Sequence, residues 1–157
     1  VATEFGNDGP GAAIHIRRGD HVTAQNAGYH GLLNSRFYEQ ALARITRRDS
    51  LRLVVFSDDP AAVSGVLGHQ ARDAYVVHPP RDSHPIESLA LMSRASAIIT
   101  ANSSFSWWGA WLAGLRAQIL CPEPWFNGAD VDELDLRPRH WQVVTSMFGT
   151  DEYKEAE

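Results

Sequence analysis

The sequence predicts an α/β fold in which a doubly wound, mainly parallel sheet carries helices on both faces. Short apolar segments rich in β-branched residues alternate along the chain with helix-length segments, which is the order of βαβ units. Polar side chains follow several of these apolar segments, where a strand would end. The 157 residues, 44% of them hydrophobic, are enough for one domain with a sizeable core.

The expected elements follow from apolar spacing and from the residues that start or stop helices. Strands are predicted at residues 12–16, 51–56, 74–77, 97–100, 118–121 and, as a last short one, 141–144. Helices are predicted at residues 36–48, 61–67, 86–96 and 104–115. Ser35 is expected to cap the first helix, residues 23–34 to form a long loop, and Pro122 to stop the fifth strand.

We expect one folded domain over residues 12–149, preceded by a lead-in or linker (1–11) and followed by a charged tail (150–157). Cys121 is the sole cysteine, which excludes an internal disulfide and a cysteine-based zinc cluster. No apolar run approaches the ~20 residues that a membrane span needs, and the first residues do not form a signal peptide. These features predict a cytoplasmic protein.

The charge balance bears on the class of partner. The chain has 14 Lys and Arg against 19 Asp and Glu, a formal net charge of −5. This argues against broad nucleic-acid binding, which needs a positive field. It remains compatible with a local basic pocket for one phosphorylated ligand.

Unusual polar residues gather where three predicted strands end. They are Arg17, Arg18, Asp20 and His21 after the first strand, Ser57, Asp58 and Asp59 after the second, and Asn102, Ser103 and Ser104 after the fourth. Ligands of doubly wound sheets bind at the carboxyl ends of the strands. We therefore expect these side chains to share one edge of the sheet.

The segment 101–112 predicts a polar turn and then the start of a helix. Asn and Ser side chains cap helices by accepting first-turn N–H groups, and a helix N-terminus suits an anion such as phosphate. The alternative is an ordinary capped helix with a Trp-rich buried face.

The two adjacent arginines match phosphate oxygens with their planar guanidinium groups. Arg17 and Arg18 should point to different sides, one toward a ligand and the other into an ion pair, for which Asp20 is a candidate. A pair of surface arginines is the alternative. Asp58 or Asp59 could accept from a base or a ribose, or else cap the helix before Pro60.

Several other patterns in the sequence have ordinary structural explanations. His15, in mid-strand, is ordinarily a satisfied core histidine. Asp130 and Asp132 have the spacing of a metal-binding pair, but they lie in a loop with Glu133 and Asp135, where solvated acids are expected. The chain has no Walker loop, dinucleotide-binding glycine loop or serine-hydrolase elbow. The strand-end residues together predict a bound nucleoside diphosphate.

Three motifs in order resemble the bacterial α-1,2-fucosyltransferases of glycosyltransferase family 11. They are HIRRGD at residues 15–20, VFSDD at 55–59 and NSSFSWWGAWL at 102–112. Pro122 and Trp125 match the Pro-x-x-Trp element that follows in that family. The resemblance covers residues 15–125. The last motif is long and specific, whereas the first is shared more widely among fucosyltransferases.

The resemblance implies the C-terminal, donor-binding, Rossmann-like domain of a GT-B enzyme that uses GDP-fucose, inverts the anomeric carbon and requires no metal. It implies that Arg17 is catalytic, holding the β-phosphate and assisting departure of GDP. His15 would lie against the guanosine, Asp58 or Asp59 would contact the guanine or ribose, and Ser103 and Ser104 would hold the diphosphate. The remaining predicted substrate-binding residues are Arg18, Asp20, Ser57, Asn102 and Phe105.

The resemblance also implies a glycan acceptor, a β-galactoside, and a position in the cytoplasm, peripheral to the inner face of the cell membrane. Two departures stand out. His21 occupies a position that is usually aromatic, and the family's N-terminal domain is missing. The chain alone is therefore expected to bind GDP-fucose but to transfer it poorly. There are two alternatives. One is a non-catalytic nucleotide-sugar-binding module. The other is a GT-B-like transferase or epimerase for another nucleotide sugar, which a preference for uracil over guanine would distinguish from the fucosyltransferase.

Overall fold

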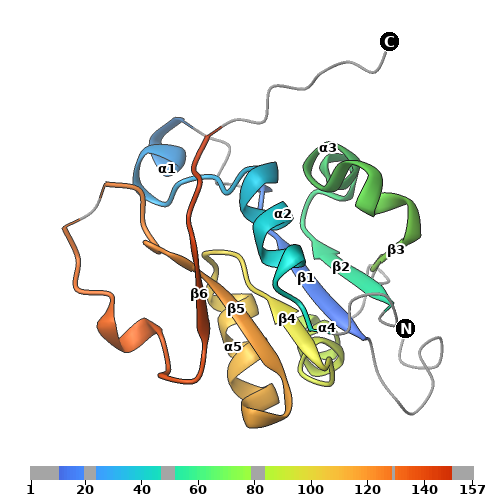
Figure 1. The fold of residues 1–157 in the computed structure, drawn as a ribbon. Coiled ribbons are helices and arrows are strands. Elements are labelled where there is room, and N and C mark those ends of the chain that lie inside the picture. The colour runs from blue at the N-terminus through green and yellow to red at the C-terminus, as the bar shows by residue number, and fades with distance from the viewer. Residues whose placement is uncertain (1–10, 20–23, 47–51, 79–83, 129, 150–157) are drawn as a thin grey trace.

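The computed structural model describes residues 11–19, 24–46, 52–78, 84–128 and 130–149. Over these ranges the chain forms a six-stranded sheet with the order β3-β2-β1-β4-β5-β6, in which all neighbouring strands are parallel. The strands are β1 (Ala12–Ile16), β2 (Leu53–Ser57), β3 (Ala74–Val76), β4 (Ala97–Ile99), β5 (Gln118–Glu123) and β6 (Gln142–Thr145). The predicted doubly wound α/β fold is confirmed (Figure 1).

Helices cover both faces of the sheet. The helices α2 (Ser35–Ala43) and α3 (Val63–Leu67) pack on one face, and α4 (Pro85–Met92) and α5 (Ser104–Ala113) pack on the other (Figure 1). A short helix, α1 (Ala24–Tyr29), precedes α2. Single 3₁₀ segments are η4 (Pro60–Ala62), η5 (Gly68–Asp73), η6 (Gly114–Arg116) and η7 (Leu134–Leu136).

Strand β1 lies inside the sheet and is buried on both of its faces. All five of its residues are buried, and it pairs with β2 on one side and β4 on the other. The strand order reverses between β1 and β4, since the chain runs outward to β3 and then returns to build β4, β5 and β6. Ligands of doubly wound sheets bind at this reversal, beyond the carboxyl ends of the strands.

The alternating side chains of β1 enter two separate cores. Ile14 and Ile16 pack with Phe37 of α2, whereas Ala13 packs with Met92 of α4 on the opposite face. The residue two positions after Ala13 is His15, so its side chain lies on the α4–α5 face of the sheet.

The helix α5 approaches α4 closely at a glycine. A Cβ at Gly109 would lie 2.5 Å from the Sδ atom of Met92, so the absence of a side chain permits this packing. The buried face of α5 consists of small residues, Ser106, Gly109, Ala110 and Ala113. Its outer face exposes Trp108, Trp111 and Leu112, so the alternative of a Trp-rich buried face is wrong.

Four predictions about elements are wrong: one before α2, two at the ends of α2 and one at the end of α5. Residues predicted as one long loop contain α1. Asn34 rather than Ser35 caps α2, since the Asn34 side chain accepts the N–H groups of Arg36 and Phe37. The same helix was predicted to reach residue 48 but ends at Ala43. The helix α5 ends at Ala113 rather than at residue 115, because Gly114 follows with φ +59°.

The ends of α4 and β5 also differ from the prediction. The helix α4 ends at Met92, short of the predicted residue 96, with Ser93 as its C-cap. Strand β5 continues through Pro122 to Glu123, paired there with β6. Strand β4 has already ended at Ile99, so beyond Leu120 only β6 pairs with β5, and a proline without an N–H is tolerated.

Some predicted features lie outside the described residues. These are the lead-in up to residue 10, Asp20, His21 and the tail 150–157. Within the residues that are described, no helix combines the length and the apolar character needed to cross a membrane.

Candidate functional site

The ends of β1 and β2 are joined by a charged contact around Asp58. The Oδ2 atom of Asp58 lies 2.5 Å from Nη1 of Arg17, and its Oδ1 atom accepts the backbone N–H of Arg18 at 2.8 Å. The side chains of Arg17 and Asp58 are about one third and one quarter exposed. Arg18 is buried, so the two arginines point to different environments, as predicted. Arg17 forms an ion pair with Asp58, whereas Asp20, the candidate partner named from the sequence, lies outside the described residues.

A glycine permits this arrangement. A Cβ at Gly19 would lie 2.3 Å from Oδ2 of Asp58 and 3.6 Å from Cζ of Arg17. Any larger residue would therefore displace the carboxylate that holds Arg17. The glycine that follows Arg17 and Arg18 is therefore needed for a steric reason.

The residues on either side of Asp58 have different surroundings. The Ser57 hydroxyl accepts the N–H of Asp59 and donates to the carbonyl oxygen of Asp59, both at 3.0 Å, so it shapes the turn that ends β2. Asp59 occupies the N-cap position before Pro60, but its side chain makes no capping hydrogen bond. Asp59 is partly exposed, so its surroundings differ from those of Asp58, which contacts Arg17 and Arg18.

His15 links β1 to the start of α5. The centroid of its ring lies 5.3 Å from the ring centroid of Phe105, and the two ring planes are tilted by 44°. The backbone carbonyl oxygen of His15 accepts a hydrogen bond from the Tyr38 hydroxyl at 3.1 Å. His15 is buried and Phe105 is partly buried. The predicted site residues His15 and Phe105 are thus brought together across the point where the strand order reverses.

The start of α5 differs from the predicted cap. Ser103 is the N-cap residue, but its side chain makes no capping hydrogen bond, and Ser104 is exposed at the first position of the helix. The buried Ser106 instead orders the turn, accepting the N–H of Ala101 at 3.2 Å and lying 3.2 Å from the carbonyl oxygen of Ser103, to which it donates. The N–H groups of the first helical turn have no partner within the helix.

Asn102 ties this turn to the segment after α1. Its amide nitrogen donates to the carbonyl oxygens of His30 at 2.6 Å and Gly31 at 3.1 Å. Both amide hydrogens are used in this way, so Oδ1 is the atom that can accept a further hydrogen bond. Asn102 is buried and has a structural role in addition to its predicted place in the site.

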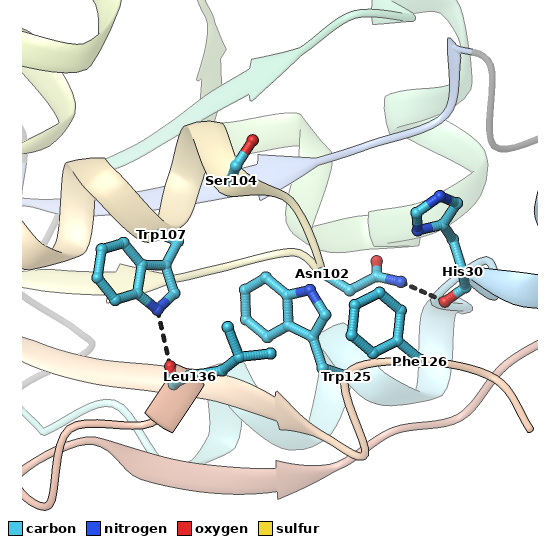
Figure 2. A pocket seen from close by; sticks show the side chains of 7 residues that line it. All are labelled: His30, Asn102, Ser104, Trp107, Trp125, Phe126 and Leu136. Atoms are coloured by element: carbon cyan, nitrogen blue, oxygen red, sulfur yellow. Dashed lines mark hydrogen bonds between the residues drawn. The ribbon is translucent and has the colours of Figure 1, made fainter. Parts of the chain in front are cut away.

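A cavity of about 410 Å³ lies beside this turn, on the β5 side of α5. Its lining combines aromatic rings with a few polar groups from three segments: His30, Asn102, Ser104, Trp107, Trp125, Phe126 and Leu136. Figure 2 shows the Trp125 and Phe126 rings side by side, with Leu136 between Trp125 and Trp107. The Trp107 indole N–H donates to the carbonyl oxygen of Leu136 at 2.7 Å and fixes one wall.

A buried carboxylate holds the opposite wall. The Oε1 and Oε2 atoms of Glu133 accept the backbone N–H of Trp125 at 2.9 and 2.8 Å, and Oε1 also accepts the N–H of Phe126 at 3.0 Å. Arg137 donates to Oε2 at 2.7 Å and pairs with Glu123 at 3.2 Å. Glu133 was expected to be a solvated loop acid, and that expectation is wrong.

The same contacts set the ionisation of Glu133. Burial by itself raises the pKa of a carboxyl group, but the backbone N–H groups of Trp125 and Phe126 and the guanidinium of Arg137 outweigh it. The pKa of Glu133 is therefore lowered, and the side chain is a carboxylate at neutral pH.

Two further observations concern metal-ligating side chains and the cysteine thiol among the described residues. No group of three or more His, Cys, Asp or Glu side chains is placed to hold a metal ion. Cys121 is fully buried, and burial raises the pKa of its thiol to about 12, although Arg137 acts in the opposite direction. A thiol with this pKa is a poor nucleophile at neutral pH.

Sequence reasoning missed the residues that connect distant segments. His30, Trp107 and Leu136 line the cavity from three different segments, and Glu133 and Ser106 hold its surroundings in place. Ser106 sits three residues after the N-cap, a spacing that could have identified it. Nothing local in the sequence distinguishes Glu133 from Asp130, Asp132 and Asp135.

Comparison with known proteins agrees with this architecture. The model of the family described as Glycosyl transferase family 11 matches residues 6–142. An O-antigen biosynthesis glycosyltransferase, WbnK, and an alpha-1,2-colitosyltransferase, both of Escherichia coli, are each 35% identical to this chain, over 79% and 82% of its length. A bovine (Bos taurus) galactoside 2-alpha-L-fucosyltransferase, SEC1, is 30% identical over 64% of the chain and 28% of its own length. No solved structure gives a significant match.

The matched region is a part of each relative. The chain spans 42% of the O-antigen glycosyltransferase and 46% of the colitosyltransferase. The family model nevertheless covers most of this chain, including β1, β2 and the whole of α5. The chain belongs to glycosyltransferase family 11.

Proposed function

We propose that this chain is the donor-binding part of a fucosyltransferase that uses GDP-fucose. With the rest of the enzyme, it would transfer fucose to the 2-hydroxyl of a β-galactoside with inversion of the anomeric carbon. The observation that carries the proposal is the ion pair between Arg17 and Asp58 at the carboxyl ends of β1 and β2. It holds a partly exposed guanidinium where a doubly wound sheet binds its ligand.

The diphosphate would lie between Arg17 and the first turn of α5. A guanidinium is matched to phosphate oxygens, and the N–H groups and dipole of a helix N-terminus favour an anion. The exposed Ser104 and the adjacent Ser103 add hydroxyl groups at the same helix end. As the bond to fucose breaks, Arg17 would stabilise the negative charge that develops on GDP, so we propose that no metal is required.

The nucleoside would lie toward His15 and Asp59. His15 is in ring contact with Phe105, which places an aromatic surface beside the start of α5. Both oxygens of Asp58 are used by Arg17 and Arg18, whereas Asp59 makes no capping hydrogen bond. Asp59 is therefore the better candidate of the two acids for the ribose or guanine.

Transfer of colitose is a second candidate, favoured by the 35% identity to an alpha-1,2-colitosyltransferase over 82% of this chain. Colitose is fucose without its 3-hydroxyl. A site that hydrogen-bonds a substrate hydroxyl discriminates strongly against an analogue lacking it. Competition between GDP-fucose and GDP-colitose for this chain therefore separates the two donors. A uridine diphosphate sugar that binds better than both would contradict the guanine-nucleotide proposal.

The remaining parts of the proposal concern the rest of the enzyme. We propose that acceptor contacts, and any general base, come partly from a second domain, and that the enzyme works in the cytoplasm or at the inner face of the membrane.

Transfer is measured with labelled GDP-fucose, a β-galactoside and EDTA, using this chain and a longer chain that includes the second domain. Transfer by the longer chain alone is expected. Full turnover by this chain would contradict the need for that domain, and rescue by added Mg²⁺ would contradict metal independence.

A further inference from the structure

We propose that the cavity between α5 and residues 123–136 binds one pyranose ring of the glycan acceptor, with Glu133 as the positioning residue for its aromatic wall. This inference rests on the proposed function, because it assigns to the same enzyme a place for its second substrate. The cavity shares Ser104 with the proposed diphosphate site and includes Asn102, which was predicted at the same sheet edge, but its aromatic walls are not side chains assigned to the donor.

The chemistry of the cavity suits a sugar ring. Its walls are the rings of Trp107, Trp125 and Phe126 together with Leu136, and its polar groups are His30, Asn102 and Ser104. One face of a pyranose such as galactose presents C–H groups that pack on aromatic rings, while its hydroxyls need a few neutral hydrogen-bonding partners. The volume of about 410 Å³ lies within the range of small-molecule sites, on the order of 300–1,000 Å³.

A nucleotide fits the same lining less well. Among the described residues that line the cavity there is no arginine or lysine, so these residues offer a diphosphate no permanent cation. The same described residues include no carboxylate that could accept the N–H groups at the edge of guanine. An uncharged polyol with one apolar face needs neither a cation nor a carboxylate from these residues.

The cavity lies next to the proposed donor site. The first turn of α5 separates the two: Phe105 contacts His15 on the β1 side, whereas Ser104 and Trp107 line the cavity on the other side. Figure 2 shows the cavity side of this turn, with Asn102 and Trp107 reaching the cavity from the β4–α5 turn and from α5. A sugar in the cavity would therefore lie near a diphosphate bound at the same helix start.

The cavity is held in shape before any ligand binds. Glu133 fixes the backbone of Trp125 and Phe126 through three N–H···O contacts, and Arg137 fixes Glu133. Asn102 fixes the carbonyl of His30 on the third side, and Trp107 fixes that of Leu136. Rigid walls reduce the entropy lost on binding, which matters for a small neutral ligand.

The test uses saturation-transfer NMR of methyl β-D-galactopyranoside with this chain, and calorimetry of GDP with the same samples. Phe126→Ala and Leu136→Ala remove two walls, and Leu115→Ala is the matched control, since Leu115 is exposed in η6 and lies outside the cavity lining. The proposal predicts that the first two variants lose the galactoside signal at least about fivefold while GDP affinity changes less than about twofold. Leu115→Ala should keep both.

The outcomes separate this inference from the proposed function. If the wild-type chain binds GDP but shows no galactoside signal, or if the wall variants keep that signal, the cavity assignment is wrong and the donor proposal stands. Loss of GDP binding in folded wall variants would make the cavity a nucleotide pocket and overturn the inference. If wild type binds the galactoside but not GDP, the cavity assignment holds and the donor proposal fails. Binding of neither contradicts both.

The positioning role of Glu133 has its own test. Glu133→Gln replaces a carboxylate that accepts four hydrogen bonds by an amide with one acceptor oxygen. The dissociation constant of the galactoside should rise while that of GDP stays unchanged, and Glu133→Asp should recover part of the affinity. A purely structural role would lower thermal stability without this selective change, and that result would overturn the positioning role.

Discussion

Asp58 joins the ends of β1 and β2 by using both of its carboxylate oxygens on the segment that follows β1. Its Oδ2 atom lies 2.5 Å from Nη1 of Arg17, and its Oδ1 atom accepts the N–H of Arg18 at 2.8 Å. The guanidinium of Arg17 is therefore oriented before a ligand arrives, which lowers the entropy lost on binding.

Asp58→Asn should weaken binding of GDP without abolishing it. The amide keeps the size of the side chain but loses its charge, so Arg17 is less firmly oriented. We expect a loss of about 1–2 kcal/mol, corresponding to a dissociation constant roughly tenfold higher by calorimetry. Asp73→Asn, at an exposed position in η5, is the control and should bind GDP as the wild type does. Unchanged binding in Asp58→Asn would show that Arg17 needs no such support.

Gly19→Ala tests the same contact from the other side. The added Cβ would lie 2.3 Å from Oδ2 of Asp58, so the carboxylate or the loop must move. GDP affinity should fall by at least as much as in Asp58→Asn, and the combined variant should lose little more, because both changes act on one contact. Additive losses would mean that the two residues act independently. Gly28→Ala, where a Cβ meets nothing within 4 Å, is the matched control.

Asn102→Asp tests the link between the β4–α5 turn and the segment after α1. A carboxylate matches the amide in size but cannot donate to the carbonyl oxygens of His30 and Gly31. Two buried acceptors then lose their donor, and the free energy of unfolding should fall by about 2–4 kcal/mol, measured by urea denaturation. Asn127→Asp, which loses a longer bond to the Ala27 carbonyl, should cost less. An equal cost at the two positions would contradict the role given to Asn102.

The lowered pKa of Glu133 predicts a specific pH dependence of stability. Its stabilisation is fully present above the ordinary glutamate pKa and is lost as the pH falls through the lower pKa of the folded state. Glu133→Gln should therefore be about 1–3 kcal/mol less stable than wild type near neutral pH. The difference should shrink as the pH falls below the ordinary glutamate pKa of about 4.3, because the wild-type group becomes protonated. A difference that stays constant as the pH falls would contradict the assigned ionisation.

The sheet could be predicted from the sequence because its strands are local signals. Leu53 to Phe56 and Ala97 to Ile99 are apolar runs that only a buried strand explains, and their alternation with helices fixed the fold class. The strand-end residues Arg17, Asp58 and Ser104 were predicted for the same reason, since parallel strands bring their carboxyl ends to one edge.

The partners of those residues could not be predicted, because they depend on tertiary contacts. Nothing in the sequence indicates that Asp58 would face Arg17, or that Glu133 alone among the acids of its loop would turn inward to Trp125. Helix ends were also missed where a neighbour competed for the cap, as with Asn34 beside Ser35. The fold was therefore easier to foresee than the cavity, which is assembled from three segments far apart in the chain.

The measurement that tests the central claim most directly is calorimetric titration of this chain with GDP and UDP, repeated on Arg17→Ala. The account predicts that GDP binds, that UDP does not, and that the variant loses about 1.5–3 kcal/mol of binding free energy while remaining folded. GDP binding that is unchanged in Arg17→Ala, or UDP binding as tight as GDP binding, would contradict a guanine-nucleotide site built on Arg17.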